Sequence, residues 1–259
     1  MSYVDLHLHL LPGVDDGAPD EAAAIAHARR LAAEGVRDVT VTPHINRYWP
    51  LEIDTIPERV AALASLLDER AVGVRVRSGG ELDARYARDL SDEQLEIIAQ
   101  GPSDSRWLLV EAPFRGLDHE FLADCAALAQ RGFGALIAHP ERARGADEPE
   151  GLEALQHLLA EGAAAQVNVC SLLGNNGLAV QETAVHLLRS GLAYVIASDG
   201  HPGTREHTLA LGFVLAQRAG ASSVQAWRLT QGNPRFLLSH GIPQAPSPAT
   251  VAALELALD

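Results

Sequence analysis

The arrangement of histidine and acidic residues at the ends of apolar runs is the feature that most limits what this chain can fold into. The chain opens with Asp5-Leu6-His7-Leu8-His9, and single His, Glu or Asp residues then end later apolar runs as far as Asp199-Gly200-His201. Residues two apart on a strand point to the same face, so His7 and His9 can bind one ion together. Repeated delivery of such side chains at strand ends predicts a barrel whose open face binds a cluster of cations.

Short β-like runs alternate with longer Ala- and Leu-rich helical patterns. The predicted strands are residues 3–7, 38–42, 74–78, 108–111, 135–138, 165–169 and 193–197. The predicted helices, where apolar residues recur every three or four positions, include residues 19–34, 56–70, 91–100, 119–130, 151–160 and 181–189. This alternation implies an α/β fold with a parallel sheet. Seven strands with helices outside favour a closed or distorted barrel, and a doubly wound open sheet is the alternative.

Length and charge exclude several classes of protein. The 259 residues suit one barrel-sized domain, which we place at residues 1–241, or at most two small domains. Residues 242–259 are expected to form a Pro-rich tail with a short helix over 251–258. A formal net charge of −14 argues against a nucleic-acid-binding surface. The two cysteines indicate a reducing compartment. No apolar stretch approaches about 18 residues, so we predict a cytoplasmic protein with no membrane insertion.

A loop rich in Pro, Gly and Asp follows the first strand. It reads Leu11-Pro12-Gly13-Val14-Asp15-Asp16-Gly17 and can fold back over the strand end. Because a helix is predicted from Pro19, either aspartate could serve as a turn or N-cap residue. We expect one of Asp15 and Asp16 to do so and the other to bind metal, and the spacing does not decide between them.

Five later strand ends each present a potential metal ligand. They are His44, Glu81, Glu111, His139 and Asp199, with His201 two residues further on. A carboxylate that closes an apolar strand is hard to explain as part of a core, because an unpaired buried charge is costly. Imidazole and carboxylate without thiolate suit zinc, manganese or iron. About eight ligands are too many for one ion and fit two or three ions bridged by carboxylates.

Arginines are also placed to meet a phosphate. His139-Pro140-Glu141-Arg142 puts a guanidinium one short turn from an expected ligand, and its planar donors match phosphate oxygens. The alternative is a surface arginine paired with Glu141 or Asp147. Three further arginines on strand-end loops could rim the mouth of the site: Arg47, Arg115 and Arg205.

One motif points to a different chemistry. Cys125 and Arg131 have the Cys-x5-Arg spacing of thiol-dependent tyrosine phosphatases. That mechanism needs a loop of backbone N–H groups and an activated thiolate, whereas the residues between are Ala, Leu and Gln, which form helix. We interpret the spacing as coincidence and Cys170 as a buried small apolar residue.

Taken together, these segments resemble the PHP (polymerase and histidinol phosphatase) superfamily, and within it the bacterial metal-dependent tyrosine phosphatases of capsule and exopolysaccharide operons. The matching segments include Asp5–His9 with Leu11–Ala18, Thr42–His44, Gly80-Glu81, Glu111–Phe114, His139–Arg142, Gln166–Asn168, Ser171–Gly174 and Ala197–His201. The resemblance covers roughly residues 1–241.

The resemblance implies a distorted seven-stranded (β/α) barrel with a trinuclear site, usually credited to manganese, at the C-terminal ends of the strands. Its implied ligands, with Glu81 bridging, are His7, His9, Asp16, His44, Glu81, Glu111, His139, Asp199 and His201. It thus selects Asp16 over Asp15. Arg142 corresponds to the phosphate-clamping arginine, and we expect His201 and Asp199 to act in the reaction beside it.

The implied function is hydrolysis of phosphotyrosine, with the tyrosine-rich tail of a cognate polysaccharide-synthesis kinase as substrate. The nearest rival is a PHP phosphatase acting on a small ester such as histidinol phosphate. A second rival, C–N bond hydrolysis by an amidohydrolase, often uses a lysine bridge, and this chain contains no lysine. A non-catalytic scaffold would be supported by lost ligands, and none is lost.

Overall fold

A computed structural model describes residues 2–242 of the chain. Strands and helices alternate through these residues, and every strand pairing is parallel. Within the described part, the strands are β1 (Tyr3–Leu8), β2 (Val36–Val41), β3 (His44–Ile45), β4 (Arg75–Ser78), β5 (Glu81–Asp83), β6 (Trp107–Glu111), β7 (Gly134–Ala138), β8 (Ala164–Asn168) and β9 (Val195–Ala197). The predicted α/β fold with a parallel sheet is therefore confirmed.

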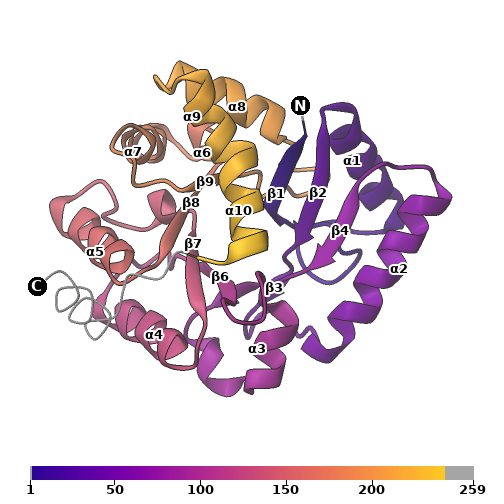
Figure 1. The fold of residues 1–259 in the computed structure, drawn as a ribbon, viewed down its shortest axis with the longest axis horizontal. Helices are drawn as coiled ribbons and strands as arrows, with labels where there is room; N and C mark the ends of the chain where they lie inside the picture. The colour runs from indigo at the N-terminus through magenta and orange to yellow at the C-terminus, as the bar shows by residue number, and fades with distance from the viewer. Residues whose placement is uncertain (1, 243–259) are drawn as a thin grey trace, which may run out of the picture.

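Helices lie around the outside of the strands (Figure 1). The α-helices are α1 (Glu21–Ala33), α2 (Ile56–Glu69), α3 (Asp92–Ile98), α4 (His119–Gln130), α5 (Pro149–Ala160), α6 (Val169–Leu173), α7 (Leu178–Arg189), α8 (Leu209–Arg218), α9 (Ser223–Trp227) and α10 (Asn233–His240). Short 3₁₀ turns occupy Ile53–Thr55, Tyr86–Asp89 and Pro140–Arg142, and a π-helical turn occupies Arg228–Gly232. The six predicted helices correspond to α1–α5 and α7. The first begins two residues later than predicted because Asp20 is its N-cap and accepts from the Ala23 amide.

The strands form two sheets, of order β1-β2-β4 and β3-β5-β6-β7-β8-β9. Two short interruptions divide them: Thr42-Pro43 lies between β2 and β3, and Gly79-Gly80 lies between β4 and β5. His44 and Glu81 were expected just past the ends of their strands, and they do follow β2 and β4, but neither lies in a loop. Each residue starts a short strand, and the two are register partners. Pairing resumes because the chain stays extended after each break.

The first strand also meets the segment that follows the last one. The Asp199 amide donates to the His7 carbonyl, and the His9 amide donates to the Gly200 carbonyl. These two bonds link the carboxyl end of β1 in the small sheet to the segment after β9 in the large sheet. The residues with predicted chemistry on both segments are thereby brought together.

A second apolar cluster, which we call the floor, lies among the strands at the end opposite to the residues with predicted chemistry. It comprises Val4, Leu6, Trp107, Leu109, Leu136, Ala138, Ala164, Val195, Leu237 and Ile242, all buried. Helix α10 closes it, since the Trp107 indole donates to the Leu237 carbonyl at 3.0 Å and the Asn233 Nδ2 atom donates to the Tyr194 carbonyl. The floor seals the amino ends of the strands against water.

No helix among the described residues is long and apolar enough to cross a membrane. The predicted Pro-rich tail with its short helix lies, apart from Ile242, outside the described residues.

Candidate metal centre

His7 and His9 lie at the carboxyl end of β1 and form the deepest part of the site. Both are fully buried, and their Nε2 atoms are 3.3 Å apart, as the alternation of a strand requires for two ligands of one face. The His7 Nδ1 atom contacts the Gln166 Oε1 atom at 2.9 Å, and the His9 Nδ1 atom contacts the Asp15 carboxylate at 2.7 Å. These contacts orient each ring so that Nε2 faces the centre of the site.

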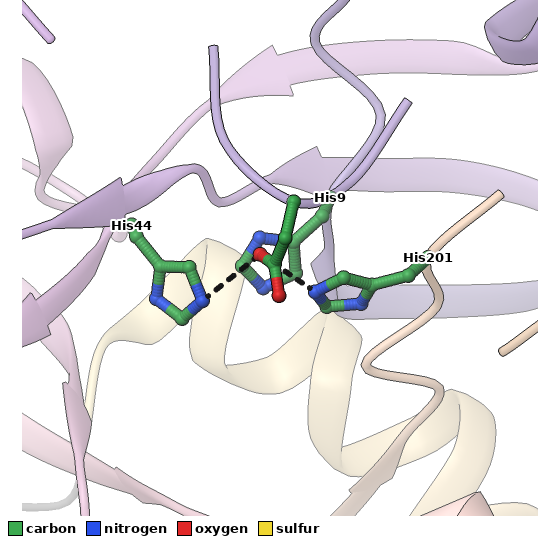
Figure 2. Close-up of side chains that lie close together, drawn as sticks. His9, His44 and His201 are labelled. Atoms are coloured by element: carbon green, nitrogen blue, oxygen red, sulfur yellow. Dashed lines mark ion pairs between the residues drawn. The ribbon is translucent and has the colours of Figure 1, made fainter. Parts of the chain in front are cut away.

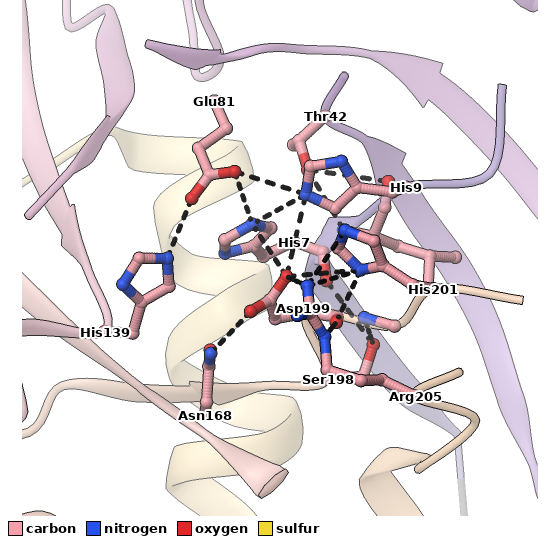
Figure 3. Close-up of polar contacts among 12 residues, drawn as sticks. His7, His9, Thr42, Glu81, His139, Asn168, Ser198, Asp199, His201 and Arg205 are labelled. Carbon is pink, nitrogen blue, oxygen red and sulfur yellow. Dashed lines mark hydrogen bonds and ion pairs between the residues drawn. The ribbon is translucent and has the colours of Figure 1, made fainter. Parts of the chain in front are cut away.

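Glu81 lies among four of the histidines, and Figure 3 shows it beside three of them, His7, His9 and His139. Its Oε2 atom is 3.0–3.4 Å from the nearest ring nitrogens of three histidines, which are His7, His9 and His44. Its Oε1 atom is 2.8 Å from His139 Nε2. Although burial raises its pKa, the charges of His7 and His44 and the hydrogen bond from His139 hold the pKa of Glu81 well below its usual range. Two oxygens directed at separate sets of imidazoles suit a bridging carboxylate.

The two glycines before Glu81 allow its strand to approach β2 and β3. A Cβ atom at Gly79 would lie 2.5 Å from the Thr40 Cγ2 atom, and one at Gly80 would lie 2.7 Å from the Ile45 Cγ1 atom. A side chain at either position would therefore require neighbouring atoms to shift.

Asp16 covers the outer side of the site. Its Oδ1 atom is 3.3 Å from the Nε2 atoms of both His44 and His201, and Figure 2 shows these two rings close to His9. Hydrogen bonds from His201 and His44 lower the pKa of Asp16 far below its ordinary value. Burial lowers the pKa of His44, but Glu81 and Asp16 outweigh it and raise that pKa to about 11. The site therefore has a strong attraction for positive charge.

Asp199 follows β9 and receives hydrogen bonds from three side chains. They come from Asn168 Nδ2 at 2.7 Å, Arg142 Nη1 at 3.1 Å and Arg205 Nη2 at 3.2 Å. Burial raises the pKa of Asp199, but the charges of His7, His139 and Arg205 lower it far below its ordinary value. Asp199 and His139 both have left-handed backbones, with φ of 48° and 37°. A non-glycine residue adopts that conformation only where the surrounding structure holds it.

Glu111 is the last residue of β6 and pairs in register with Ala138 of β7. Burial and the nearby charge of Glu81 raise its pKa to about 7. Two carboxyl groups in one pocket resist simultaneous ionisation unless cations lie between them.

All nine predicted ligands fall into four overlapping groups whose donor atoms lie within 4.8 Å of one another. The groups are His9, Asp16, His44 and His201; His7, His9 and Glu81; His7, His139 and Asp199; and His44, Glu81 and Glu111. His139 Nδ1 is buried with no hydrogen-bond partner among residues 2–242. Because neighbouring groups share imidazole and carboxylate donors, the cluster fits more than one divalent cation.

Three residues that support the site had no supporting role assigned from the sequence. The amides of Gln166 and Asn168 on β8 hydrogen-bond to His7, to Asp199 and to each other. Asp15, left open as a turn or ligand residue, accepts from the Gly17 and His44 amides and contacts His9. It is a turn residue that also orients a ligand.

The arginines differ in what they contact. Arg142 is mostly buried and donates to Asp199 rather than pairing with Glu141 or Asp147. Arg205 contacts Asp199 and both ring nitrogens of His201, so it lies deeper than a rim residue. Arg47 pairs with Asp89, and Arg115 pairs with Asp118, both outside the ligand set.

The two cysteines do not form a thiolate site. Cys125 lies within α4 with its thiol buried, and burial raises its pKa to about 12. A thiol protonated at neutral pH cannot act as a phosphatase nucleophile. Cys170 is fully buried in α6, as predicted.

Comparison with known proteins identifies the family. Residues 3–238 match the model of the family described as capsular polysaccharide synthesis, CpsB/CapC. The chain belongs to the CpsB/CapC family. Over 223 residues it is 32% identical to the tyrosine-protein phosphatase YwqE of Bacillus subtilis strain 168, covering 84% of this chain and 85% of that protein.

Solved structures agree with this placement. The chain superposes with a TM-score of 0.79 and 28% identity, over 95% of this chain and 96% of the other, on a structure from work on YwqE of Bacillus subtilis and CpsB of Streptococcus pneumoniae, described as unique metal-dependent tyrosine phosphatases. A histidinol phosphate phosphatase from Lactococcus lactis shares the fold at a TM-score of 0.53 and 15% identity, over 86% of this chain and 95% of that one. The predicted resemblance to PHP-type tyrosine phosphatases is confirmed at the level of family and fold.

Proposed function

We propose that this chain is a metal-dependent protein-tyrosine phosphatase. The observation that carries the proposal is the convergence of nine imidazole and carboxylate side chains beside a mostly buried arginine at the strand ends. The homology to YwqE supports phosphotyrosine as the substrate. Because the thiol of Cys125 is buried in a helix, the reaction proceeds without a phosphocysteine.

The nine residues in the four groups would hold two or three divalent ions, for which we propose Mn²⁺; Fe and Zn are alternatives that the same donors accept. Glu81 would bridge two of these ions, since its two oxygens face different histidines. Bound cations lower the pKa of water and polarise the phosphate oxygens. Cations bound there would also offset the acidity that otherwise repels a phosphate.

Arg142 binds the phosphate. Among the described residues, Nη1 is the only atom of its guanidinium that hydrogen-bonds to protein, so Nη2 and Nε remain as donors for equatorial oxygens. Asp199 holds this guanidinium in place. We propose that His201 assists departure of the phenolate, whose pKa near 10 demands less protonation than an alkoxide would.

We further propose that the strands form one distorted seven-stranded barrel. Counting β2 with β3 and β4 with β5 as interrupted strands gives seven, and the bonds from β1 to the segment after β9 support closure. The proposed setting is the cytoplasm, with the tail of a cognate tyrosine kinase as substrate.

Metal analysis combined with activity measurements tests the proposal. The purified protein should contain about two to three divalent ions per chain. It should hydrolyse a phosphotyrosine peptide, lose that activity with a chelator and regain it with Mn²⁺. Iodoacetamide should have no effect. Activity that survives chelation and is lost on alkylation would overturn the proposal. Faster turnover of histidinol phosphate than of phosphotyrosine would show that the substrate is a small phosphate ester instead.

A further inference from the structure

Phe114 is a large apolar side chain left exposed beside the site. It lies three residues after Glu111, and 60% of its surface is exposed. The backbone around it is fixed: the Arg144 amide donates to the Phe114 carbonyl, and the Gly116 amide donates to the Pro113 carbonyl. Gly116 has a φ of 114°, and a Cβ atom there would lie 2.9 Å from the Arg144 carbonyl oxygen. Phe114 is therefore held in its exposed position by its loop rather than by burial of its ring.

The ring of Phe114 contacts the proposed phosphate-binding arginine. The Arg142 Cζ atom lies 5.0 Å from the ring centroid, within the range of a cation–π contact. The same guanidinium also donates a hydrogen bond to the Asp199 carboxylate at 3.1 Å. Any phosphate bound by Arg142 is thus within one side-chain length of an exposed aromatic ring. One part of that ring contacts the arginine, and the exposed part remains open to a ligand.

We propose that Phe114 is a specificity-determining residue that binds the phenyl ring of an aryl phosphate while Arg142 binds its phosphate. This inference rests on the proposed function and names the residue that distinguishes aryl from alkyl esters. Aromatic rings attract one another in offset or edge-to-face geometry at centroid separations of about 4.5–7 Å. An alkyl phosphate presents the same anion to Arg142 and offers no such contact. The expected contribution is a factor of about two to ten in binding.

Non-hydrolysable ligands separate this contact from the chemical step. Inhibition constants for phenylphosphonate and methylphosphonate are measured against phosphotyrosine-peptide hydrolysis by wild type, Phe114→Ala and Phe114→Tyr. We expect Phe114→Ala to weaken the binding of phenylphosphonate about two- to tenfold and the binding of methylphosphonate much less. Phe114→Tyr should retain wild-type binding of phenylphosphonate because it keeps the ring.

Phe236 provides a matched control. It is also an exposed phenylalanine, but it stacks on His240 in α10, the helix that closes the floor at the opposite end of the strands. Phe236→Ala should leave both inhibition constants unchanged. Metal content and thermal midpoint are measured for every variant and should show that Phe114→Ala is folded and carries its metal.

The outcomes distinguish this inference from the proposed function. Equal weakening of both phosphonates in Phe114→Ala, or no change in either, overturns the role of Phe114 while wild-type phosphotyrosine hydrolysis stands. Absence of phosphotyrosine hydrolysis in the metal-loaded wild type overturns the proposed function itself.

Discussion

The two ends of one sheet face differ in chemistry although the same strands build them. On β6, Trp107 and Leu109 belong to the floor, and Glu111, two residues on, belongs to the ligand set. Past β9 the change is the same, from Val195 in the floor to Asp199 among the ligands. The apolar end excludes water and fixes the strands, so the polar end can hold charged groups in defined positions. The candidate site is confined to this polar end of the strands.

The largest effect should follow from neutralising the centre of the polar end. Glu81→Gln keeps the shape of the side chain and removes the charge shared by four histidines. We expect metal to be lost and turnover of a phosphotyrosine peptide to fall by about 10³-fold or more. Elemental analysis and steady-state kinetics measure both, with the surface variant Glu96→Gln as control. Full metal content in Glu81→Gln would remove this residue from the ligand set.

Removing the phosphate donor should lower turnover without emptying the site. Arg142→Ala is expected to keep its metal and to reduce turnover by about 10²- to 10³-fold, the usual cost of one donor to developing charge. Arg115→Ala, which removes an exposed arginine paired with Asp118, should stay near wild type. Loss of metal from Arg142→Ala would show that the arginine supports Asp199 structurally.

A smaller effect is expected one step away from the ligands. Asp15→Asn weakens the hold on the His9 ring, whose Nδ1 atom lies 2.7 Å from the carboxylate. Metal affinity should fall about 10- to 100-fold, which competition with a chromogenic chelator measures. Asp20→Asn changes an aspartate of the same segment that only caps α1, and it should leave metal affinity unchanged. Equal affinities in the two variants would contradict an orienting role for Asp15.

The floor should respond in the opposite way. Leu136 is fully buried there, and Leu136→Ala should lower the free energy of unfolding by about 2–5 kcal/mol. Turnover per folded, metal-loaded molecule should stay close to wild type at low temperature. Denaturant titration measures the free energy of unfolding, and steady-state kinetics measure the turnover. As a control, Leu136→Met should lower the free energy of unfolding by less than about 1.5 kcal/mol. A drop in turnover as large as that of Arg142→Ala would show that the two ends are not separable.

The weakest effect should be the pH dependence contributed by His27. This histidine is buried on α1, neither ring nitrogen has a hydrogen-bond partner within residues 2–242, and burial lowers its pKa to about 4. The unfolded chain, with a pKa near 6.5, binds the proton more readily, so stability is lost as pH falls through that window. The loss is at most about 1.4 kcal/mol per pH unit. His27→Leu should flatten the difference between unfolding curves at pH 7 and pH 5, and an unchanged slope would contradict it.

The sequence predicts the fold class and the convergence of the nine site residues better than the details of their placement. His7 and His9 are recognisable because strand alternation is local. That His44 and Glu81 start short strands was not predictable, because renewed pairing after Pro43 and Gly79-Gly80 depends on the neighbouring strand. Arg205 reaches the site because its backbone folds back on His201, with each amide donating to the other residue's carbonyl, and no local pattern reveals this.

The left-handed backbones of His139 and Asp199 make the centre a preorganised receptor. A free chain rarely visits that conformation, at a cost of about 1–2 kcal/mol per residue, so folding alone sets the shape of these two strand ends. A divalent ion bound here would meet donors already in place and would spend little of its binding free energy on ordering them. Cation exchange should accordingly leave the surrounding backbone almost unmoved.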